Sequence, residues 1–280
     1  MTVRTTIHQR LQRSWQIQAS MLCVGLDPIR ARIPPHLRER DDALYRFCRD
    51  IVDATAPFVC AFKPQAAHFA AEAAEDQLAA LISYIHAQYP DLPVVLDAKR
   101  GDIGSTAELY AREAFERYDA DIVTLSPYLG VESIRPFLDW PGRGVAVLCR
   151  TSNQDSAWLQ SYPERDPVFL RVARAALDWN RHDNIMLVAG ATYPPELAQI
   201  RALVGEMPLL IPGVGAQGGH LAAVLASGEV PGGYGLMINS SRGVLYAGEG
   251  EHFARSAAES ARALRDAMRE LANERLSELS

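Results

Sequence analysis

The sequence predicts an α/β fold, a (β/α)8 barrel, and three observations lead to this prediction. Short runs rich in Val, Ile and Leu recur eight times within the 280 residues. Segments of helical composition or connectors follow the runs, and such alternation implies right-handed strand–helix–strand units. The runs are apolar throughout, which is typical of parallel strands buried on both faces. Eight units in about 250 residues fit the size of a TIM barrel.

The predicted strands are the eight apolar runs, taken in chain order. They lie at residues 21–28, 58–64, 92–99, 121–127, 144–152, 185–192, 208–215 and 234–241. Segments rich in Ala, Leu, Glu and Arg predict helices at residues 43–56, 72–88, 105–118, 167–181, 195–204, 218–226 and 251–276. The fourth connector, residues 131–140, has the weakest helical character. A short amphipathic helix within about residues 1–20 is expected to cover the barrel as an N-terminal extension.

The chain shows no composition break and no linker rich in Gly, Ser and Pro. Residues 1–280 are therefore expected to form a single barrel domain, and 48% hydrophobic residues suffice to bury a full core. A doubly wound open sheet is the alternative arrangement of the same elements.

Composition and charge narrow the classes of function. A net charge of −6 and a pI near 5.7 offer no basic surface for nucleic acid, and no apolar run is long enough to span a membrane. A small-molecule partner is therefore expected. Cys23, Cys48, Cys60 and Cys149 lack C-x-x-C spacing, so they are expected to be buried free thiols in a cytoplasmic protein. The seven histidines form no ligand pair of metal-site spacing, so no metal is expected.

Polar residues gather where the predicted strands end, which is where (β/α)8 barrels carry their active sites. They are Asp27, Lys63, Asp97, Lys99, Ser126, Thr151, Ser152, Asn153, Thr192, Gln217, Ser240, Ser241 and Arg242. Of the 28 basic residues only Lys63 and Lys99 are lysines, and both end apolar runs. An ammonium can hand over a proton, whereas a guanidinium stays protonated. The two lysines are therefore candidates for a chemical role that arginine cannot fill.

The segment DAKRGDIGST, residues 97–106, is the sharpest motif. Asp97 and Lys99 are two residues apart on a strand, so their side chains point to the same side, into the mouth of the barrel. Asp102 could return a second carboxylate to the ammonium, with Lys63 nearby on the second strand. The alternative is an ion-pair network that only closes the barrel. Burial of such a network is costly enough that a functional role explains it better.

The glycine-rich loop GVGAQGG, residues 213–219, and the following NSSRG segment predict a phosphate site. Loops after strands 7 and 8 often bind phosphate in these barrels, and the fork of Arg242 can hold two phosphate oxygens. The loop also matches G-x-G-x-x-G of dinucleotide-binding folds. However, it lies near the end of the chain, and no acid follows about 20 residues on. Asp27 in GLDP could accept hydrogen bonds from sugar hydroxyls.

Taken together, these motifs resemble one family. GLDP, FKP, DAKRGDIGST, RTSN, PGVGAQGG and NSSRG follow in order between Cys23 and Tyr246. This series resembles orotidine 5′-phosphate decarboxylase, within it the longer bacterial (type 2) branch. The resemblance implies a cofactor-free removal of CO2 from orotidine 5′-monophosphate to give UMP, the last step of pyrimidine synthesis.

The resemblance also implies a role for each matching residue. Lys99 would protonate C6 of the pyrimidine, and Asp97 would lie beside the substrate carboxylate. Asp97 and Asp102 would hold the lysine. Asp102, Ile103 and Thr106 would come from the partner subunit of a homodimer, so that the two sites are shared.

The remaining matches concern substrate binding. Asp27 and Lys63 match ribose-binding positions, and Gln217 and Arg242 match phosphate-binding positions. A hydroxyl after the fifth strand should meet the pyrimidine, and Thr151 and Ser152 both qualify.

Other functions remain open at this point. A Schiff-base sugar-phosphate aldolase would use Lys63 or Lys99 as the nucleophile, although two carboxylates around Lys99 would keep it protonated. A metal-dependent decarboxylase of a sugar-acid phosphate would place similar acids around Mg²⁺. A non-catalytic phosphosugar-binding barrel would bind UMP without turning over orotidine monophosphate.

Overall fold

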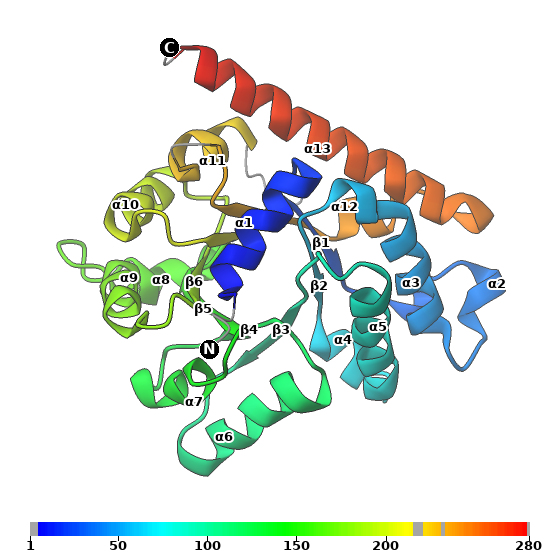
Figure 1. Ribbon diagram of the computed structural model, residues 1–280, viewed down its shortest axis with the longest axis horizontal. Helices are drawn as coiled ribbons and strands as arrows, with labels where there is room; N and C mark the ends of the chain where they lie inside the picture. Colours follow the sequence, from blue (N-terminus) through cyan, green and yellow to red (C-terminus); the bar gives the residue numbers. More distant parts are fainter. Residues whose placement is uncertain (1–4, 215–220, 231–232, 279–280) are drawn as a thin grey trace.

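Parallel strands form the centre of the molecule, with helices around them (Figure 1). The sheet has eight strands, in the order β2-β1-β8-β7-β6-β5-β4-β3. The computed structural model describes residues 5–214, 221–230 and 233–278. The strands are β1 Leu22–Leu26, β2 Ala61–Pro64, β3 Val95–Arg100, β4 Ile122–Leu125, β5 Gly144–Arg150, β6 Ile185–Ala189, β7 Leu209–Pro212 and β8 Leu236–Ser240. Bridges between Phe62 and Val94 and between Gln65 and Asp97 join β2 to β3. The predicted (β/α)8 barrel is confirmed, and the open doubly wound sheet is excluded.

Helices surround the barrel, and most lie where the sequence predicts them. The α-helices are α1 Ile7–Gln18, α2 Pro35–Arg38, α3 Ala43–Thr55, α4 Ala66–Ala70, α5 Glu75–Gln88, α6 Gly104–Arg112, α7 Arg135–Leu138, α8 Ala157–Gln160, α9 Val168–Trp179, α10 Pro194–Val204, α11 Leu221–Gly228, α12 Arg242–Leu245 and α13 Phe253–Glu278. Short 3-10 turns are Arg30–Arg32, Ala56–Phe58, Val131–Ser133, Gln154–Ser156 and Gly250–His252, and a π-helical turn, Glu113–Arg117, continues α6. None of the described helices is both long and apolar enough to cross a membrane.

Two helix predictions need correction. The helix predicted from residue 72 begins only at Glu75. Ala73 adopts a left-handed conformation with φ of 48°, which a right-handed helix cannot include. The weak connector 131–140 holds only a 3-10 turn and the four-residue α7, whose first turn contains Pro136. The start predicted for the helix at 218–226 lies outside the described residues.

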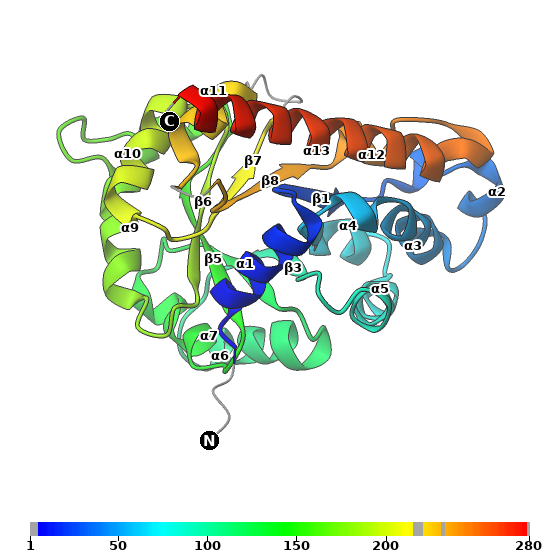
Figure 2. The ribbon, with the colours of Figure 1, turned by 45° about the horizontal axis from the view of Figure 1, so that its top comes forward.

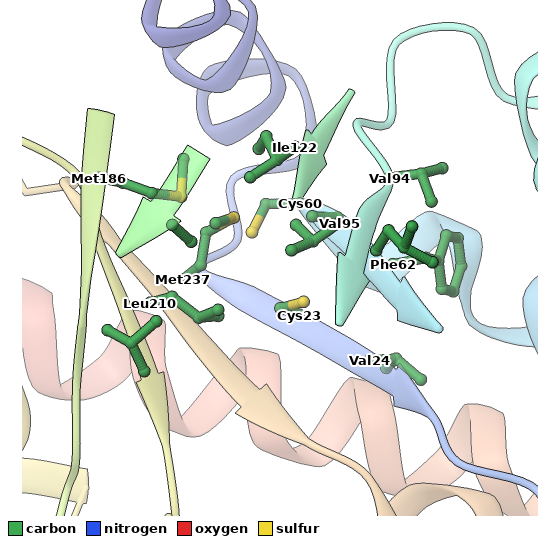
Figure 3. Packing of buried hydrophobic residues seen from close by; sticks show 14 of the residues in the cluster. Cys23, Val24, Cys60, Phe62, Val94, Val95, Ile122, Met186, Leu210 and Met237 are labelled. Atoms are coloured by element: carbon green, nitrogen blue, oxygen red, sulfur yellow. The ribbon is translucent and has the colours of Figure 1, made fainter. Parts of the chain in front are cut away.

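The barrel interior is filled by an apolar layer beneath a polar one. In Figure 3, Val95, Ile122 and Met237 meet inside the barrel, and all three are fully buried. Side chains two residues apart on a strand point the same way. Asp97 therefore lies above Val95, and Thr124 lies above Ile122. The apolar layer supports the charged groups from below.

Helix α1 covers the amino-terminal end of the barrel, opposite the strand ends that carry the polar residues (Figures 1 and 2). Thr6 begins it with a capping box formed with Gln9. His8 Nε2 lies 2.8 Å from the carbonyl oxygen of Ile185, at the start of β6. Ser14 Oγ donates to the carbonyl of Cys60, just before β2, at 2.7 Å. The N-terminal helix is thus fastened to strands far apart in the sequence.

Asp121, which precedes β4, is a buried carboxylate at the amino-terminal end of the barrel, and several charged side chains contact it. Its carboxylate accepts hydrogen bonds from Arg10 Nη1 at 2.5 Å, His86 Nε2 at 3.0 Å and the amide of Val94 at 2.8 Å. Burial opposes the charged form, but His86 and Arg10 outweigh it and hold the pKa of Asp121 below its ordinary value. Burial and the nearby Arg10 would lower the pKa of His86, but Asp121 and Asp119 outweigh them and raise it. This network fixes α1 and α5 to the barrel.

The four cysteines are free and buried, as predicted. Burial raises the pKa of the Cys23 thiol to about 12, which leaves it protonated and unreactive at neutral pH. Cys23 and its neighbours therefore contribute packing to the core.

Candidate active site

Two adjoining cavities open at the carboxyl ends of the strands. One has a volume of about 560 Å³ and lies over β3 to β7, with Lys99 and Thr124 in its lining. The other, of about 490 Å³, lies over β1, β7 and β8. Both cavities are lined by Lys63, Asp97 and Pro212. The two cavities therefore form one elongated site, and these three residues lie where they join.

Asp97 stands at the junction and binds both lysines of the chain. Its Oδ1 lies 2.6 Å from Lys99 Nζ, and its Oδ2 lies 2.8 Å from Lys63 Nζ. Burial works against the charged carboxylate, but Lys63 and Lys99 lower its pKa well below the ordinary value. The predicted grouping of Asp97, Lys99 and Lys63 is therefore present, and the carboxylate is ionised at neutral pH.

The two lysines differ in their surroundings. The side chain of Lys63 is 6% exposed, whereas that of Lys99 is 49% exposed. Burial would lower the pKa of Lys63, but Asp97 and Asp27 outweigh this effect and raise it. Lys63 is thus a fixed buried cation. Lys99 projects from the same carboxylate into the larger cavity, where a substrate could reach it.

The backbone at Lys99 is bent out of the regular strand. Lys99 has a φ of 46°, in the left-handed region, which costs a residue with a Cβ about 1 kcal/mol. The register between β3 and β4 shifts at this point, between Leu96 and Arg100. Thr124 Oγ1 accepts hydrogen bonds from the amides of Ala98 and Lys99 at 3.0 and 2.9 Å. A side chain of β4 therefore satisfies the amides that the shift leaves without a strand partner.

Asp102 does not return to Lys99 within the chain. Its Oδ1 accepts a hydrogen bond from the amide of Ile103 at 2.8 Å, and it lines neither cavity. Ile103 and Thr106 are exposed on the same segment. The expectation that a second carboxylate reaches the ammonium from the same chain is thus wrong, because Asp102 bonds the amide of the next residue instead of Lys99.

The smaller cavity contains two acceptors that have no hydrogen-bond partner among the described residues. Asp27, after β1, and Asn239, in β8, line the smaller cavity. Their Oδ1 atoms are buried and accept no hydrogen bond from any described residue. A buried acceptor without a donor is costly, so both atoms are suited to receive hydroxyl groups of a ligand. Tyr246 fixes the segment after Asp27, because its hydroxyl accepts from the amide of Ile29 at 2.7 Å.

One wall of the smaller cavity is formed by the turn from β8 into α12. Arg242 is the first residue of α12, is exposed and lines the smaller cavity with Ser240 and Ser241. No described residue forms an ion pair or hydrogen bond with its guanidinium, which leaves it available to an anion. Gly25 permits the close approach of this turn, because a Cβ there would overlap Ser241 Oγ. Gln217 lies outside the described residues.

The segment after β5 presents one free hydroxyl to the larger cavity. Thr151 Oγ1 donates a hydrogen bond to Asn153 Oδ1 at 2.7 Å and accepts one from Gln160 Nε2 at 2.9 Å. Ser152 lines the same cavity, and its hydroxyl has no hydrogen-bond partner within the described part of the chain. Gly190 packs against Ser152 so closely that a Cβ would lie 2.6 Å from Ser152 Cα. Of the two hydroxyls that the sequence left open, Ser152 is the available one.

Arg150 holds this segment in place from below. It is almost fully buried, forms an ion pair with Glu196 and stacks over the Tyr193 ring at 3.8 Å. It also donates to Ser156 Oγ at 2.5 Å. The loop that carries Ser152 is therefore rigidly supported.

The sequence analysis did not identify Thr124 as a site residue, and it included Asn239 only within the NSSRG segment of the predicted phosphate site. In the fourth run it named Ser126, at the end of the predicted strand, and not Thr124. A threonine within an apolar run, at the position where alternation directs it inward, was the signal available for Thr124. Among the residues that the structure describes, no group of three His, Cys, Asp or Glu side chains is arranged to hold a metal ion.

Comparisons with known proteins point to one family. A family model described as orotidine 5′-phosphate decarboxylase / HUMPS family matches residues 20–257. Orotidine 5′-phosphate decarboxylase of Azoarcus sp. (strain BH72) is 57% identical over 260 residues, which cover 92% of this chain and 96% of that protein. The enzyme of the same name from Janthinobacterium sp. (strain Marseille) is 54% identical over 94% of this chain and 98% of its own length.

Solved structures show the same architecture. A crystal structure from Toxoplasma gondii has a TM-score of 0.87 and 34% identity, covering 96% of this chain and 98% of its own. The OMP decarboxylase of Leishmania donovani has a TM-score of 0.78 and 36% identity, covering 93% of this chain and 99% of its own. The likeness spans the whole barrel, including every strand that contributes to the two cavities.

Proposed function

The chain belongs to the orotidine 5′-phosphate decarboxylase / HUMPS family, and we propose that Lys99 and Asp97 are the groups with which it converts orotidine 5′-monophosphate to UMP and CO2. It is a carboxy-lyase of pyrimidine biosynthesis, as the names of relatives more than half identical to it indicate. The observation that carries the assignment of roles is the Asp97–Lys99 pair in the larger cavity. An anion-binding end at Arg242 lies in the adjoining cavity.

The chemistry needs a cation and a proton at one carbon. When the bond between C6 and the carboxylate breaks, CO2 leaves and the electron pair stays on C6. Lys99 supplies positive charge where this pair develops and then transfers an ammonium proton to C6, leaving a neutral amine. Because the side chain is half exposed, water can restore the proton. Atoms and charges balance without a cofactor, so we propose a cofactor-free reaction.

Asp97 has two functions in this proposal. Its bond to Lys99 Nζ holds the ammonium in one position before substrate arrives, so little reorganisation is needed during the reaction. Its negative charge beside the substrate carboxylate also disfavours the bound ground state relative to a transition state in which CO2 is leaving. Lys63 forms an ion pair with the second oxygen of Asp97. This pair offsets part of the free-energy cost of burying the carboxylate.

The rest of the nucleotide would occupy the smaller cavity. Asp27 and Lys63 would bind ribose hydroxyls, and Arg242, with Gln217, would bind the phosphate. Ser152 would meet the pyrimidine from the β5 side. Binding energy from the phosphate, distant from the reacting carbon, can be used to hold C6 against Lys99.

A homodimer with shared sites is part of the proposal. Ile103 and Thr106 are exposed, Asp102 is half-buried, and none of the three lines a cavity of its own barrel, which is expected of groups that complete a partner's site. Large apolar side chains are exposed on this segment and on the neighbouring turn after β4. They are Ile103, Leu109, Tyr128 and Leu129. An exposed apolar surface of this kind is suited to bind a second copy of the chain. We also propose a cytoplasmic location, which the free buried thiols support.

The direct test is loss of the orotate chromophore on addition of the protein in buffer containing EDTA. Rapid decay with wild-type protein and none with Lys99→Ala supports the proposal. Absence of decay with folded wild-type protein that still binds UMP would instead indicate a binding barrel. Decay that EDTA abolishes would indicate a metal-dependent decarboxylase.

A borohydride experiment separates the aldolase. Lys99 Nζ lies 2.6 Å from Asp97 Oδ1, and this ion pair would have to break before the nitrogen could attack a carbonyl. Incubation with a ketose phosphate and borohydride should therefore leave the mass of the protein unchanged. A covalent adduct on Lys63 or Lys99 contradicts the decarboxylase assignment of these residues.

A further inference from the structure

We propose that Thr124 is a positioning residue, whose hydroxyl fixes both the backbone and the carboxylate partner of Lys99. This inference rests on the role of Lys99 stated above, and it concerns a residue on β4 that does not itself need to touch the substrate. Thr124 is 2% exposed, so its hydroxyl is buried in the wall of the barrel.

The Thr124 hydroxyl makes three hydrogen bonds, each to the part of the chain that carries the lysine. It accepts from the amides of Ala98 and Lys99, at 3.0 and 2.9 Å. It donates to Asp97 Oδ1 at 2.9 Å. A hydroxyl has one proton to donate and two lone pairs, so its bonding capacity is fully used.

The strand pairing explains why a side chain is needed at this place. Leu96 pairs with Val123, and the next pair is Arg100 with Leu125. Three residues of β3 therefore face Thr124 alone on β4. Regular pairing would offer their amides backbone carbonyls, but the bulge carries them out of reach. The Thr124 hydroxyl takes the place of the missing carbonyl.

The same bulge gives Lys99 its unusual backbone. With φ at 46° the residue is in a conformation that costs free energy and persists only where its surroundings hold it. Thr124 is the group that holds it, because it binds the amide of Lys99 itself. The direction in which the lysine side chain leaves the strand therefore depends on this hydroxyl.

Thr124 also acts on the charged end of the lysine. Asp97 Oδ1 receives both the Thr124 hydroxyl and the Lys99 ammonium. Without the hydroxyl, Lys63 would still hold Oδ2, but Oδ1 would be bonded to the Lys99 ammonium alone, so the position that it gives to the ammonium would be less restricted. Thr124 thus fixes Lys99 at its backbone and at its Nζ.

The position of the proton donor should affect the rate of the chemical step more than it affects the affinity for substrate. Misplacement of a catalytic group by about 1 Å can cost roughly 100-fold in rate. The phosphate-binding end, at Arg242 and Ser241, lies in the other cavity and has no contact with Thr124. Loss of the hydroxyl should therefore lower kcat and leave nucleotide affinity almost unchanged.

The experiment compares Thr124→Val and Thr124→Ala, which lack the hydroxyl, with Thr124→Ser, which retains it. For each, kcat and KM for orotidine 5′-monophosphate and Kd for UMP are measured. We expect kcat to fall about 100-fold in the Val and Ala variants, with KM and Kd within about threefold of wild type. Thr124→Ser should stay within about fivefold in kcat.

Thr55→Val serves as the matched control, because Thr55 is a fully buried threonine whose hydroxyl bonds a helix carbonyl, Ile51, far from the site. Its kcat should equal that of wild type.

Several results would overturn the inference. The first is a kcat of Thr124→Val within threefold of wild type. The second is a fall in kcat that is as large in Thr124→Ser as in Thr124→Val. The third is a change in KM, with kcat unaltered. If both Val and Ala variants fail to bind UMP, the hydroxyl serves folding and the proposal is also wrong. Failure of the function itself would appear separately, as absence of turnover by the wild-type protein.

Discussion

Lys63 Nζ lies 2.8 Å from Asp97 Oδ2, and both side chains are more than nine-tenths buried. This ion pair joins β2 to β3, the two strands whose pairing consists of isolated bridges. The same carboxylate that holds Lys99 thus helps to close the barrel at a place where only isolated bridges join the backbones. Stability and activity share this contact.

Removal of Lys63 should therefore destabilise the fold. Lys63→Met leaves one oxygen of a buried carboxylate without its cation, and breaking such a pair costs about 3 kcal/mol. Urea denaturation should show this loss in the free energy of unfolding. Lys63→Arg keeps the charge and should lose less stability and less activity. Equal unfolding free energies of wild type and Lys63→Met would contradict the prediction.

Replacement of Lys99 by arginine should abolish most activity without unfolding the protein. Guanidinium keeps the charge but is a poor proton donor, and general acid catalysis alone contributes roughly 10²- to 10⁴-fold. We expect kcat for Lys99→Arg to fall by about 1,000-fold or more. The melting temperature and Kd for UMP serve as controls and should change little. A variant that retains a tenth of wild-type kcat would show that Lys99 does not donate the proton.

Arg242→Ala should weaken phosphate binding selectively. A hydrogen-bonded charge pair contributes about 2 kcal/mol, so Kd for UMP should rise roughly 30-fold, as isothermal calorimetry can measure. Binding of uridine, which lacks the phosphate, should be unaffected. Arg255→Ala is the matched control, because Arg255 is an exposed arginine of α13 paired with Glu259. An equal effect on UMP and uridine would place the phosphate elsewhere.

Asp102 gives a test of the shared site. Lys99→Ala and Asp102→Asn homodimers should each be inactive. In mixed dimers one site carries both changes and the other carries neither, so random exchange of subunits should restore about a quarter of wild-type activity. The mixture is assayed after reversible dissociation, and each variant treated alone is the control. If activity stays at the level of the separate variants, Asp102 acts within its own chain or the sites are not shared.

His86 should make stability depend on pH. Asp121 raises the pKa of His86 above its ordinary value of about 6.5. A raised folded-state pKa means that the stabilisation is fully present below the unfolded-state pKa and is lost as the pH rises through the folded value. The difference in melting temperature between wild type and His86→Gln should thus be larger at pH 5.5 than at pH 8.5. A difference that is constant or grows with pH would contradict this.

Much of the site could be predicted because it follows from strand alternation. Asp97 and Lys99 end a buried run two residues apart, and an Asp–x–Lys pair at that position must point into the barrel mouth. Lys63 ends the neighbouring run. The sequence therefore predicted the group of charges around Asp97, and the structure adds the distances between them.

Other parts could not be predicted, because they depend on departures from regular pairing. The bulge opposite Thr124 depends on how two strands pair, and the pattern of residues in either run alone does not predict it. The position of Asp102 depends in the same way on the path of the loop after Gly101. Alternation predicts side-chain direction only while the strands stay in register.

The position of α1 has a consequence for the order in which the chain can assemble. A ribosome produces α1 before it produces β6, yet the helix is bonded through His8 to Ile185 at the start of that strand. During synthesis the apolar face of α1, with Leu11 and Trp15, cannot complete this contact until residues 19–185 have followed the helix. The base of the barrel is therefore sealed late, by the helix that was made early.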